Sequence, residues 1–72
     1  MQVLVTGATG FLGGHLVTKL IQQGDQVRIL ARHTANIQHL RSQGVEIVYG
    51  DLADKASLKT AIDGVEIVYH LG

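Results

Sequence analysis

The stretch Val3-Leu4-Val5-Thr6-Gly7-Ala8-Thr9-Gly10-Phe11-Leu12-Gly13 decides the fold of this sequence. A short apolar run leads into a turn with three glycines, and an amphipathic segment follows at once. In this setting each glycine has its own use. Gly7 allows a tight turn off a strand, Gly10 lets the backbone approach a phosphate group closely, and Gly13 lets the next helix pack against the sheet. The N–H groups and the positive dipole end of that helix would then hold the phosphates.

The glycine-rich turn has two alternative interpretations. A Walker-type loop for ATP or GTP hydrolysis needs Gly-Lys-Ser/Thr, but no Lys follows these glycines before Lys19, so nucleotide hydrolysis is not expected. The remaining alternative is a turn in which the glycines serve structure alone.

Alternating apolar runs and helix-like segments continue to the end of the chain. Leu12, Leu16 and Leu20 recur at four-residue intervals, with Val17 and Ile21 widening the stripe, which predicts an amphipathic helix over residues 11–23. Further helices are expected over 34–43, with Ile37 and Leu40 inward, and from Asp54 as N-cap, with Leu58, Ala61 and Ile62 inward. Gly24, Gly44 and Gly64 end the three helices. The expected strands cover residues 3–5, 27–32, 45–49 and 65–71.

This alternation predicts an α/β fold of the Rossmann type. Mostly apolar strands separated by helices favour a parallel sheet covered on both faces, and right-handed crossovers leave few topologies. We expect four strands in the order 3-2-1-4, two helices on one face and the third on the other. The reversal between strands 1 and 4 opens a crevice at their C-terminal ends, where ligands bind in such sheets.

The hexapeptide Gly44-Val-Glu-Ile-Val-Tyr49 recurs unchanged as Gly64-Val-Glu-Ile-Val-Tyr69. We interpret both copies as helix stops that feed buried strands, where few residue types fit. An internal duplication is the alternative, and a solenoid is excluded because the flanking residues do not repeat.

Composition narrows the function classes. The chain has 72 residues, 46% of them hydrophobic and 17% charged, which fits one small globular unit. Six Lys and Arg balance six Asp and Glu, so neither nucleic acid nor an anionic membrane is expected as a partner. No Cys is present, no apolar run is long enough to span a bilayer and no basic leader precedes the first strand, so a cytoplasmic protein is expected. The four His residues lack metal-ligand spacing, and Tyr49 and Tyr69 are expected to be packing residues.

Three motifs together resemble the extended short-chain dehydrogenase/reductase family, which includes NAD-dependent epimerases/dehydratases and dihydroflavonol-reductase-like enzymes. They are Thr-Gly-x-x-Gly-x-x-Gly at residues 6–13, Gly50-Asp51-Leu52 after the third strand and His70-Leu71-Gly72 at the end of the fourth. The resemblance covers the whole chain and implies an NAD(P)-binding domain. It implies that Asp51 bonds the adenine amino group, that Leu52 lines the adenine pocket and that Leu71 and Gly72 border the ribose and nicotinamide path. The cofactor-binding set in the turn is Gly7, Thr9, Gly10, Phe11, Leu12 and Gly13.

Asp51 has one other reading, as a cap for the third helix, although Asp54 fits that role better.

Cofactor choice depends on the end of the second strand. An NAD site places an acidic residue there, but the position 19 residues after Gly13 is Arg32. Asp25 starts the same strand, roughly 20 Å away. Arg32 suits a 2′-phosphate, with Arg28 a weaker candidate and His33 able to assist, so NADP is the expected cofactor. The alternative is a solvated Arg32 with NAD bound without an acidic partner.

The Tyr-x-x-x-Lys pair that family enzymes use to move the substrate proton is not found in this sequence, so no catalytic residue is assigned.

The apolar stretch 65–71 is also a poor edge strand. We therefore expect residues 1–72 to be the N-terminal portion of one NAD(P)-binding domain in a larger enzyme. By itself this portion should self-associate, with a homodimer as the simplest product. The parent is expected to be an oxidoreductase, epimerase or dehydratase acting on a small molecule. The alternative is a non-catalytic, NmrA-like regulatory module.

Overall fold

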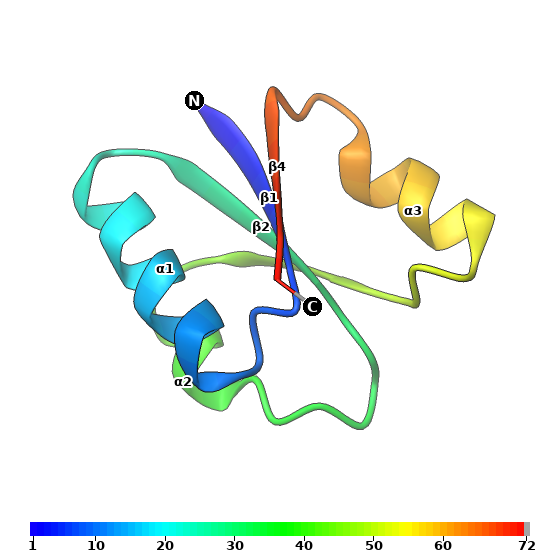
Figure 1. The fold of residues 1–72 in the computed structure, drawn as a ribbon, viewed down its shortest axis with the longest axis horizontal. Coiled ribbons are helices and arrows are strands. Elements are labelled where there is room, and N and C mark those ends of the chain that lie inside the picture. The colour runs from blue at the N-terminus through cyan, green and yellow to red at the C-terminus, as the bar shows by residue number, and fades with distance from the viewer. Residues whose placement is uncertain (72) are drawn as a thin grey trace.

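The structure, a computed structural model, describes residues 1–71 and alternates strand and helix along this whole length (Figure 1). The elements are β1 (Gln2–Thr6), α1 (Phe11–Gln22), β2 (Gln26–Ala31), α2 (Gln38–Arg41), β3 (Glu46–Tyr49), α3 (Lys55–Ile62) and β4 (Ile67–His70). The glycines at positions 24, 44 and 64 have positive φ angles of 91°, 84° and 75°, so the predicted helix stops are confirmed.

The strands form one parallel sheet in the order β3-β2-β1-β4, as predicted. Thr6 at the end of β1 pairs with Leu30 of β2 on one side and with His70 of β4 on the other. Ala31, the last residue of β2, pairs with Tyr49, the last residue of β3. This register brings the C-terminal ends of the four strands to one edge of the sheet.

Two hydrophobic clusters cover the two faces of the sheet, and Figure 1 shows α1 and α2 on one side with α3 on the other. On the first face, Val17 and Leu20 of α1 and Leu40 of α2 pack against alternate residues of β1 and β2. On the second face, Ala61 of α3 packs with Leu4 and Leu30. The prediction of two helices on one face and a third on the other is therefore confirmed.

The buried stripe of α1 differs from the prediction at its first turn. Leu12 was expected to face the core, but it is 72% exposed. The buried positions are Gly13, Val17 and Leu20, and Leu12 does not lie on that face, because successive residues of an α-helix are turned by about 100°. The spacing of large apolar residues indicates roughly which side of a helix is buried, but it overlooks a buried glycine such as Gly13.

The structure also differs from the prediction in the length of the second helix and in the burial of α3. The helix expected over 34–43 is reduced to the single turn Gln38–Arg41, although Ile37 and Leu40 are buried as predicted. The side-chain oxygen of Asn36 accepts a hydrogen bond from the backbone N–H of Gln38 at 3.4 Å, a local bond that competes with an earlier helix start. In α3, Ile62 was expected to face inward but is 45% exposed.

The repeated hexapeptide supplies both edges of the sheet. Its first copy contains β3 and its second contains β4, which are the two outer strands. Ile47 and Val48 are half-buried, whereas Ile67 and Val68 of β4 are 38% and 51% exposed. The expectation of buried strands is therefore wrong, because each copy has a hydrogen-bonded neighbour on one side only.

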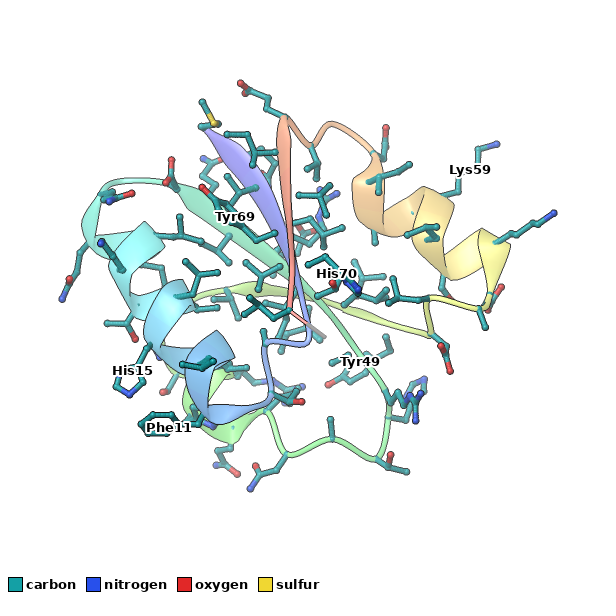
Figure 2. The ribbon with its side chains drawn as sticks, in the orientation of Figure 1. Phe11, His15, Tyr49, Lys59, Tyr69 and His70 are labelled. Atoms are coloured by element: carbon teal, nitrogen blue, oxygen red, sulfur yellow. The ribbon has the colours of Figure 1, made fainter. Side chains whose placement is uncertain are left out.

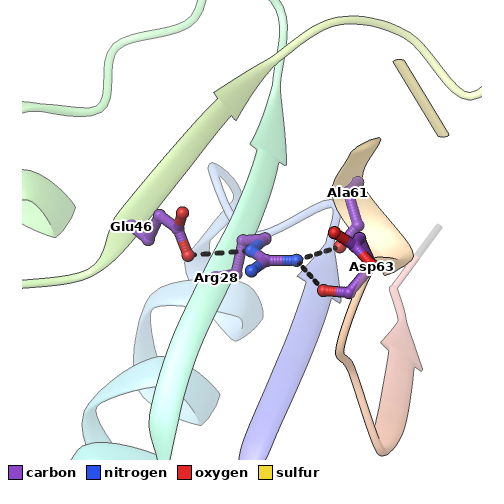
Figure 3. Close-up of polar contacts among 4 residues, drawn as sticks. All are labelled: Arg28, Glu46, Ala61 and Asp63. Atoms are coloured by element: carbon purple, nitrogen blue, oxygen red, sulfur yellow. Dashed lines mark hydrogen bonds and ion pairs between the residues drawn. The ribbon is translucent and has the colours of Figure 1, made fainter. Parts of the chain in front are cut away.

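Arg28, in the middle of β2, joins this strand to β3 and to the C-terminal end of α3 (Figure 3). Its Nε lies 2.8 Å from a carboxylate oxygen of Glu46 in β3. Its Nη1 donates to the carbonyl oxygens of Ala61 and Asp63 at the C-terminal end of α3, at 2.9 Å and 2.7 Å. A cation at this end of a helix satisfies carbonyls that lack helical partners. Arg28 is therefore a structural residue, and its candidacy for a ligand phosphate is wrong.

Replacing Arg28 by Met is expected to lower the free energy of unfolding by about 1–3 kcal/mol, because the apolar stem stays while two carbonyls lose a charged donor. Urea denaturation measures this loss. Glu46→Gln is the matched control, because the Glu46 side chain is 59% exposed and its ion pair is worth at most about 1 kcal/mol. Equal losses in the two variants would contradict the role assigned to the α3 carbonyls.

Candidate functional site

A cleft of about 350 Å³ opens at the end of the sheet where the C-terminal ends of the strands lie together. It lies at the reversal between β1 and β4, where the topology predicts a ligand site. Six of the ten predicted cofactor-binding residues line it, and they come from all four strand ends: Gly7, Thr9, Arg32, Asp51, Leu52 and Leu71. The fold therefore brings together residues that are up to 64 positions apart in the sequence.

Gly7 forms the turn that closes one end of the cleft. Its φ of +77° lies in the left-handed region, which L side chains rarely adopt. A Cβ at this position would also overlap the backbone carbonyl oxygen of Leu71. The backbone N–H of Leu71 donates to the carbonyl of Thr6 at 3.0 Å, so the turn and the end of β4 are in close contact.

Gly10, by contrast, is not required by the packing of the chain. Its φ of −83° and ψ of 175° suit any residue, and the nearest atom to an added Cβ would be the carbonyl oxygen of Gly7 at 3.9 Å. As the N-cap of α1, Gly10 offers no side-chain acceptor, and the first turn of α1 contains no acidic residue. The N–H groups of that turn therefore have no side-chain cap among the described residues, and they could hold an external anion.

Gly13 has a packing role, although its contact differs from the expected one. A Cβ at this position would overlap the backbone of Ala8, which is 1% exposed. The close approach is thus between α1 and the glycine turn itself, rather than between α1 and the sheet.

Phe11 and Leu12 lie outside the cleft. Their exposed fractions are 81% and 72%, and Phe11 meets the ring of His15 edge to face at a centroid distance of 4.5 Å. Figure 2 shows both rings at the end of α1 that adjoins the glycine turn. Phe11 and Gly10 line a second, shallower hollow, which Thr9 shares with the main cleft. Leu12 and Gly13 line neither of the two.

Arg32 and Asp51 face each other across the cleft. The Nε of Arg32 and the Oδ2 of Asp51 are 3.5 Å apart, and their side chains are 75% and 47% exposed. The other carboxylate oxygen of Asp51 accepts a hydrogen bond from the backbone N–H of Ala53 at 3.1 Å. This exposed pair is weak enough to exchange partners when a ligand arrives.

The cap of α3 is Asp54, as predicted, and the alternative role for Asp51 is excluded. The carboxylate of Asp54 accepts from the Ser57 hydroxyl at 2.8 Å and from the backbone N–H of Ala56 at 3.0 Å. These hydrogen bonds, the Ser57 hydroxyl first, hold the pKa of Asp54 below its usual value. Asp51 thus remains available to the cleft.

Two further lining residues were not assigned to the site from the sequence. The hydroxyl of Thr6, which is 3% exposed, lies 2.6 Å from Nδ1 of His70. Both residues line the cleft, and they pair across β1 and β4. Their positions at the C-terminal ends of the two strands that border the predicted crevice could have identified them.

A third feature missed from the sequence lies beside Arg32. The ring of His33 stacks on that of Tyr49, with centroids 4.6 Å apart and an interplanar angle of 11°. The Tyr49 hydroxyl also accepts a hydrogen bond from Arg41 of α2. Tyr49, expected to be a packing residue, is 37% exposed and carries two polar neighbours.

Within residues 1–71, no cluster of His, Cys, Asp or Glu side chains has the makings of a metal site. None of the helices in this range has the length and apolar character needed to cross a bilayer.

Comparison with known proteins places this architecture. A sequence profile described as the NmrA-like family matches residues 1–71. The chain belongs to the NmrA-like family. Sterol demethylase protein B of Methylococcus capsulatus is 46% identical over 70 residues, and 2-alkyl-3-oxoalkanoate reductase of Stenotrophomonas maltophilia is 42% identical over 72 residues. These alignments cover 97% and 100% of this NmrA-like chain but 21% of each relative, so the chain spans about a fifth of their length.

Solved structures show the same N-terminal Rossmann segment in extended short-chain dehydrogenases, so the predicted fold class and family resemblance are confirmed. A nucleoside-diphosphate-sugar epimerase from Pseudomonas aeruginosa superposes with a TM-score of 0.92 at 28% identity, covering 99% of this chain and 24% of the epimerase. An NADPH-dependent quinone oxidoreductase from Escherichia coli gives 0.85 at 32% identity, with coverages of 97% and 26%. A short-chain dehydrogenase/reductase from Agrobacterium tumefaciens, solved with bound NAD, gives 0.77 at 38% identity, with coverages of 100% and 20%.

Proposed function

We propose that this chain is the dinucleotide-binding portion of an NAD(P)-dependent oxidoreductase, epimerase or dehydratase of the extended short-chain dehydrogenase type. The observation that carries the proposal is the space in front of Gly10, which the fold leaves empty although a side chain would fit there. A glycine that packing does not require is explained by a ligand that needs the room. The names of the relatives, which include reductases and an epimerase, support the same class of reaction.

Different residues of the cleft would bind different parts of the proposed cofactor. The N–H groups that follow Gly10 would hold the pyrophosphate, Asp51 and Leu52 would meet the adenine, and Leu71 would border the path of the ribose toward the nicotinamide. Bound there, the nicotinamide would supply or accept hydride. The described residues bind and orient the cofactor, and substrate chemistry belongs to the whole protein.

We propose NADP(H) as the preferred cofactor, with Arg32 as the residue that decides. Similar structures include one named as NADPH-dependent and one with bound NAD, so family membership alone leaves the choice open. Arg32 follows β2 and lines the cleft, where an NAD site would carry an acidic residue. Its guanidinium can exchange Asp51 for a 2′-phosphate, which carries more charge and offers several acceptor oxygens.

Arg32→Ala is expected to weaken NADPH binding by about 1.5 kcal/mol, or about tenfold, because one charge-assisted contact to the phosphate is lost at an exposed site. NADH binding should stay within about twofold, since NADH lacks that phosphate. Fluorescence titration of the whole protein with each cofactor measures both affinities.

The control for this variant is Lys59→Ala, which removes the same charge from the outer side of α3, away from the strand ends (Figure 2). It should leave both affinities unchanged. If Arg32→Ala lost as much affinity for NADH as for NADPH, or if the wild-type protein preferred NADH, the role assigned to Arg32 would be refuted.

A regulatory role is the second candidate function. The NmrA-like family match favours it. Mixing the NADPH-loaded whole protein with a panel of ketones separates a reductase from a regulatory protein. A reductase oxidises the bound NADPH, whereas a regulatory protein binds the cofactor and leaves it reduced.

We further propose a cytoplasmic protein that acts on a small molecule and self-associates as a homodimer, with residues 1–72 forming the N-terminal part of a single cofactor domain. The balance of six basic and six acidic residues supports the absence of nucleic-acid and membrane partners. Sedimentation of the whole protein tests the homodimer.

A further inference from the structure

The segment that follows β2 makes two side-chain contacts with the C-terminal end of β3 and the residues after it. On the cleft side, the guanidinium of Arg32 lies 3.5 Å from Asp51. The ring of the next residue, His33, stacks on Tyr49 at a centroid distance of 4.6 Å. Figure 2 shows Tyr49 beside the bend between β2 and α2. Two consecutive side chains thus join this bend to the end of β3 and to the loop that follows it.

Tyr49 is a well-fixed platform for the stack. It is the last residue of β3 and pairs in register with Ala31, the residue before Arg32. The N–H of Gly50 donates to the carbonyl of Ala31 at 2.9 Å, so the two strand ends are joined directly beyond Tyr49. Its hydroxyl accepts a hydrogen bond from Arg41 of α2, which fixes the far end of the ring.

Arg32 has little of its own to hold it. Its side chain is 75% exposed, and its ion pair with Asp51 is long and open to water. Its carbonyl accepts a hydrogen bond from the backbone N–H of Ala35 at 3.0 Å, which closes the bend but does not involve the Arg32 side chain. The stack of His33 on Tyr49 is therefore the contact that fixes the direction of the bend next to Arg32.

We propose that Tyr49 is a positioning residue for cofactor discrimination, which holds Arg32 at the mouth of the cleft through the stacked ring of His33. The proposal rests on the proposed function, because it assumes that Arg32 receives a 2′-phosphate. Without the stack, the bend must be ordered each time that phosphate binds. Ordering one residue reduces affinity by a factor on the order of ten.

The test compares NADPH and NADH dissociation constants of the full chain by fluorescence titration. Tyr49→Leu, which keeps an apolar side chain in β3, and His33→Ala should each raise the NADPH constant about fivefold to tenfold and leave the NADH constant within about twofold. Tyr49→Phe and His33→Phe keep a stacked ring, so both should retain NADPH affinity. His33 is exposed, so His33→Ala tests the proposal even where Tyr49→Leu unfolds the chain.

Combined variants separate positioning from simple damage. The double variant Tyr49→Leu/His33→Ala should bind NADPH no more weakly than either single variant, because both remove one interaction. In an Arg32→Ala background, His33→Ala should change neither constant. Equal losses of NADPH and NADH, additive losses, or no loss in His33→Ala would overturn the role of Tyr49. If Arg32→Ala itself fails to discriminate the cofactors, the proposed function fails instead.

Discussion

Gly7→Ala is expected to destabilise the chain by about 3–5 kcal/mol, which is a large part of the stability of a domain this small. Two causes add. The φ of +77° is strained for any L side chain, and the new methyl group overlaps the carbonyl oxygen of Leu71. That carbonyl belongs to the end of β4, which cannot move away without breaking the bond from the Leu71 N–H to Thr6.

Gly24→Ala separates the two causes. Gly24 has a similar φ of +91°, but no atom lies within 4 Å of an added Cβ. This variant should lose only the conformational part, about 1 kcal/mol. Chemical denaturation of both variants gives the comparison, and equal losses would show that the approach of Leu71 to Gly7 is unimportant.

Gly10→Val is expected to weaken the binding of both NADPH and NADH at least about tenfold, while the free energy of unfolding changes by less than about 1 kcal/mol. The branched side chain would occupy the space in front of the α1 N–H groups, where we place the pyrophosphate that both cofactors share. The fold tolerates the change because the backbone there is extended and nothing is closer than 3.9 Å to the Cβ.

Graded variants sharpen this measurement. Gly10→Ala should lose less affinity than Gly10→Val, because it places one carbon in the same space. Gly14→Ala, one turn further into α1, should leave binding unchanged and gain up to about 1 kcal/mol of stability from helix propensity. Calorimetric titration gives the affinities and urea midpoints give the stabilities. Full binding by Gly10→Val would mean that the glycine turn serves structure alone.

The topology was predictable because its determinants are local. Glycines mark the helix ends, Asp54 has the spacing of an N-cap, and right-handed crossovers then leave few arrangements of four parallel strands. The error at Leu12 is of another kind. The buried face is centred on Gly13, Val17 and Leu20, and a small buried glycine does not appear in a pattern of large apolar residues, so the spacing of the leucines placed the centre of the stripe too close to Leu12.

The site was predictable to the level of strand ends and no further. Sequence placed Arg32 and Asp51 after neighbouring strands, and both line the cleft. Their pairing across it depends on side-chain directions, which the spacing of motifs leaves undetermined. The stack of His33 on Tyr49 was missed because it depends on the path of the bend after β2. The role of Arg28 was missed because the end of α3 is distant in sequence.

The identical hexapeptides create a competition during folding. Either copy could add to either free edge of the β2–β1 pair, since both carry the same pattern and even the same Glu for Arg28. Loop-closure entropy favours the nearer copy on β2 by only about 1 kcal/mol. The residue after each copy differs, however. Gly50 leaves no room for a side chain against Ser57, whereas His70 bonds the buried Thr6 hydroxyl. If the two copies exchanged places in the sheet, the imidazole of His70 would collide with α3 and the Thr6 hydroxyl would lose its partner. The residue that follows each hexapeptide therefore favours the native order of strands over the exchanged order.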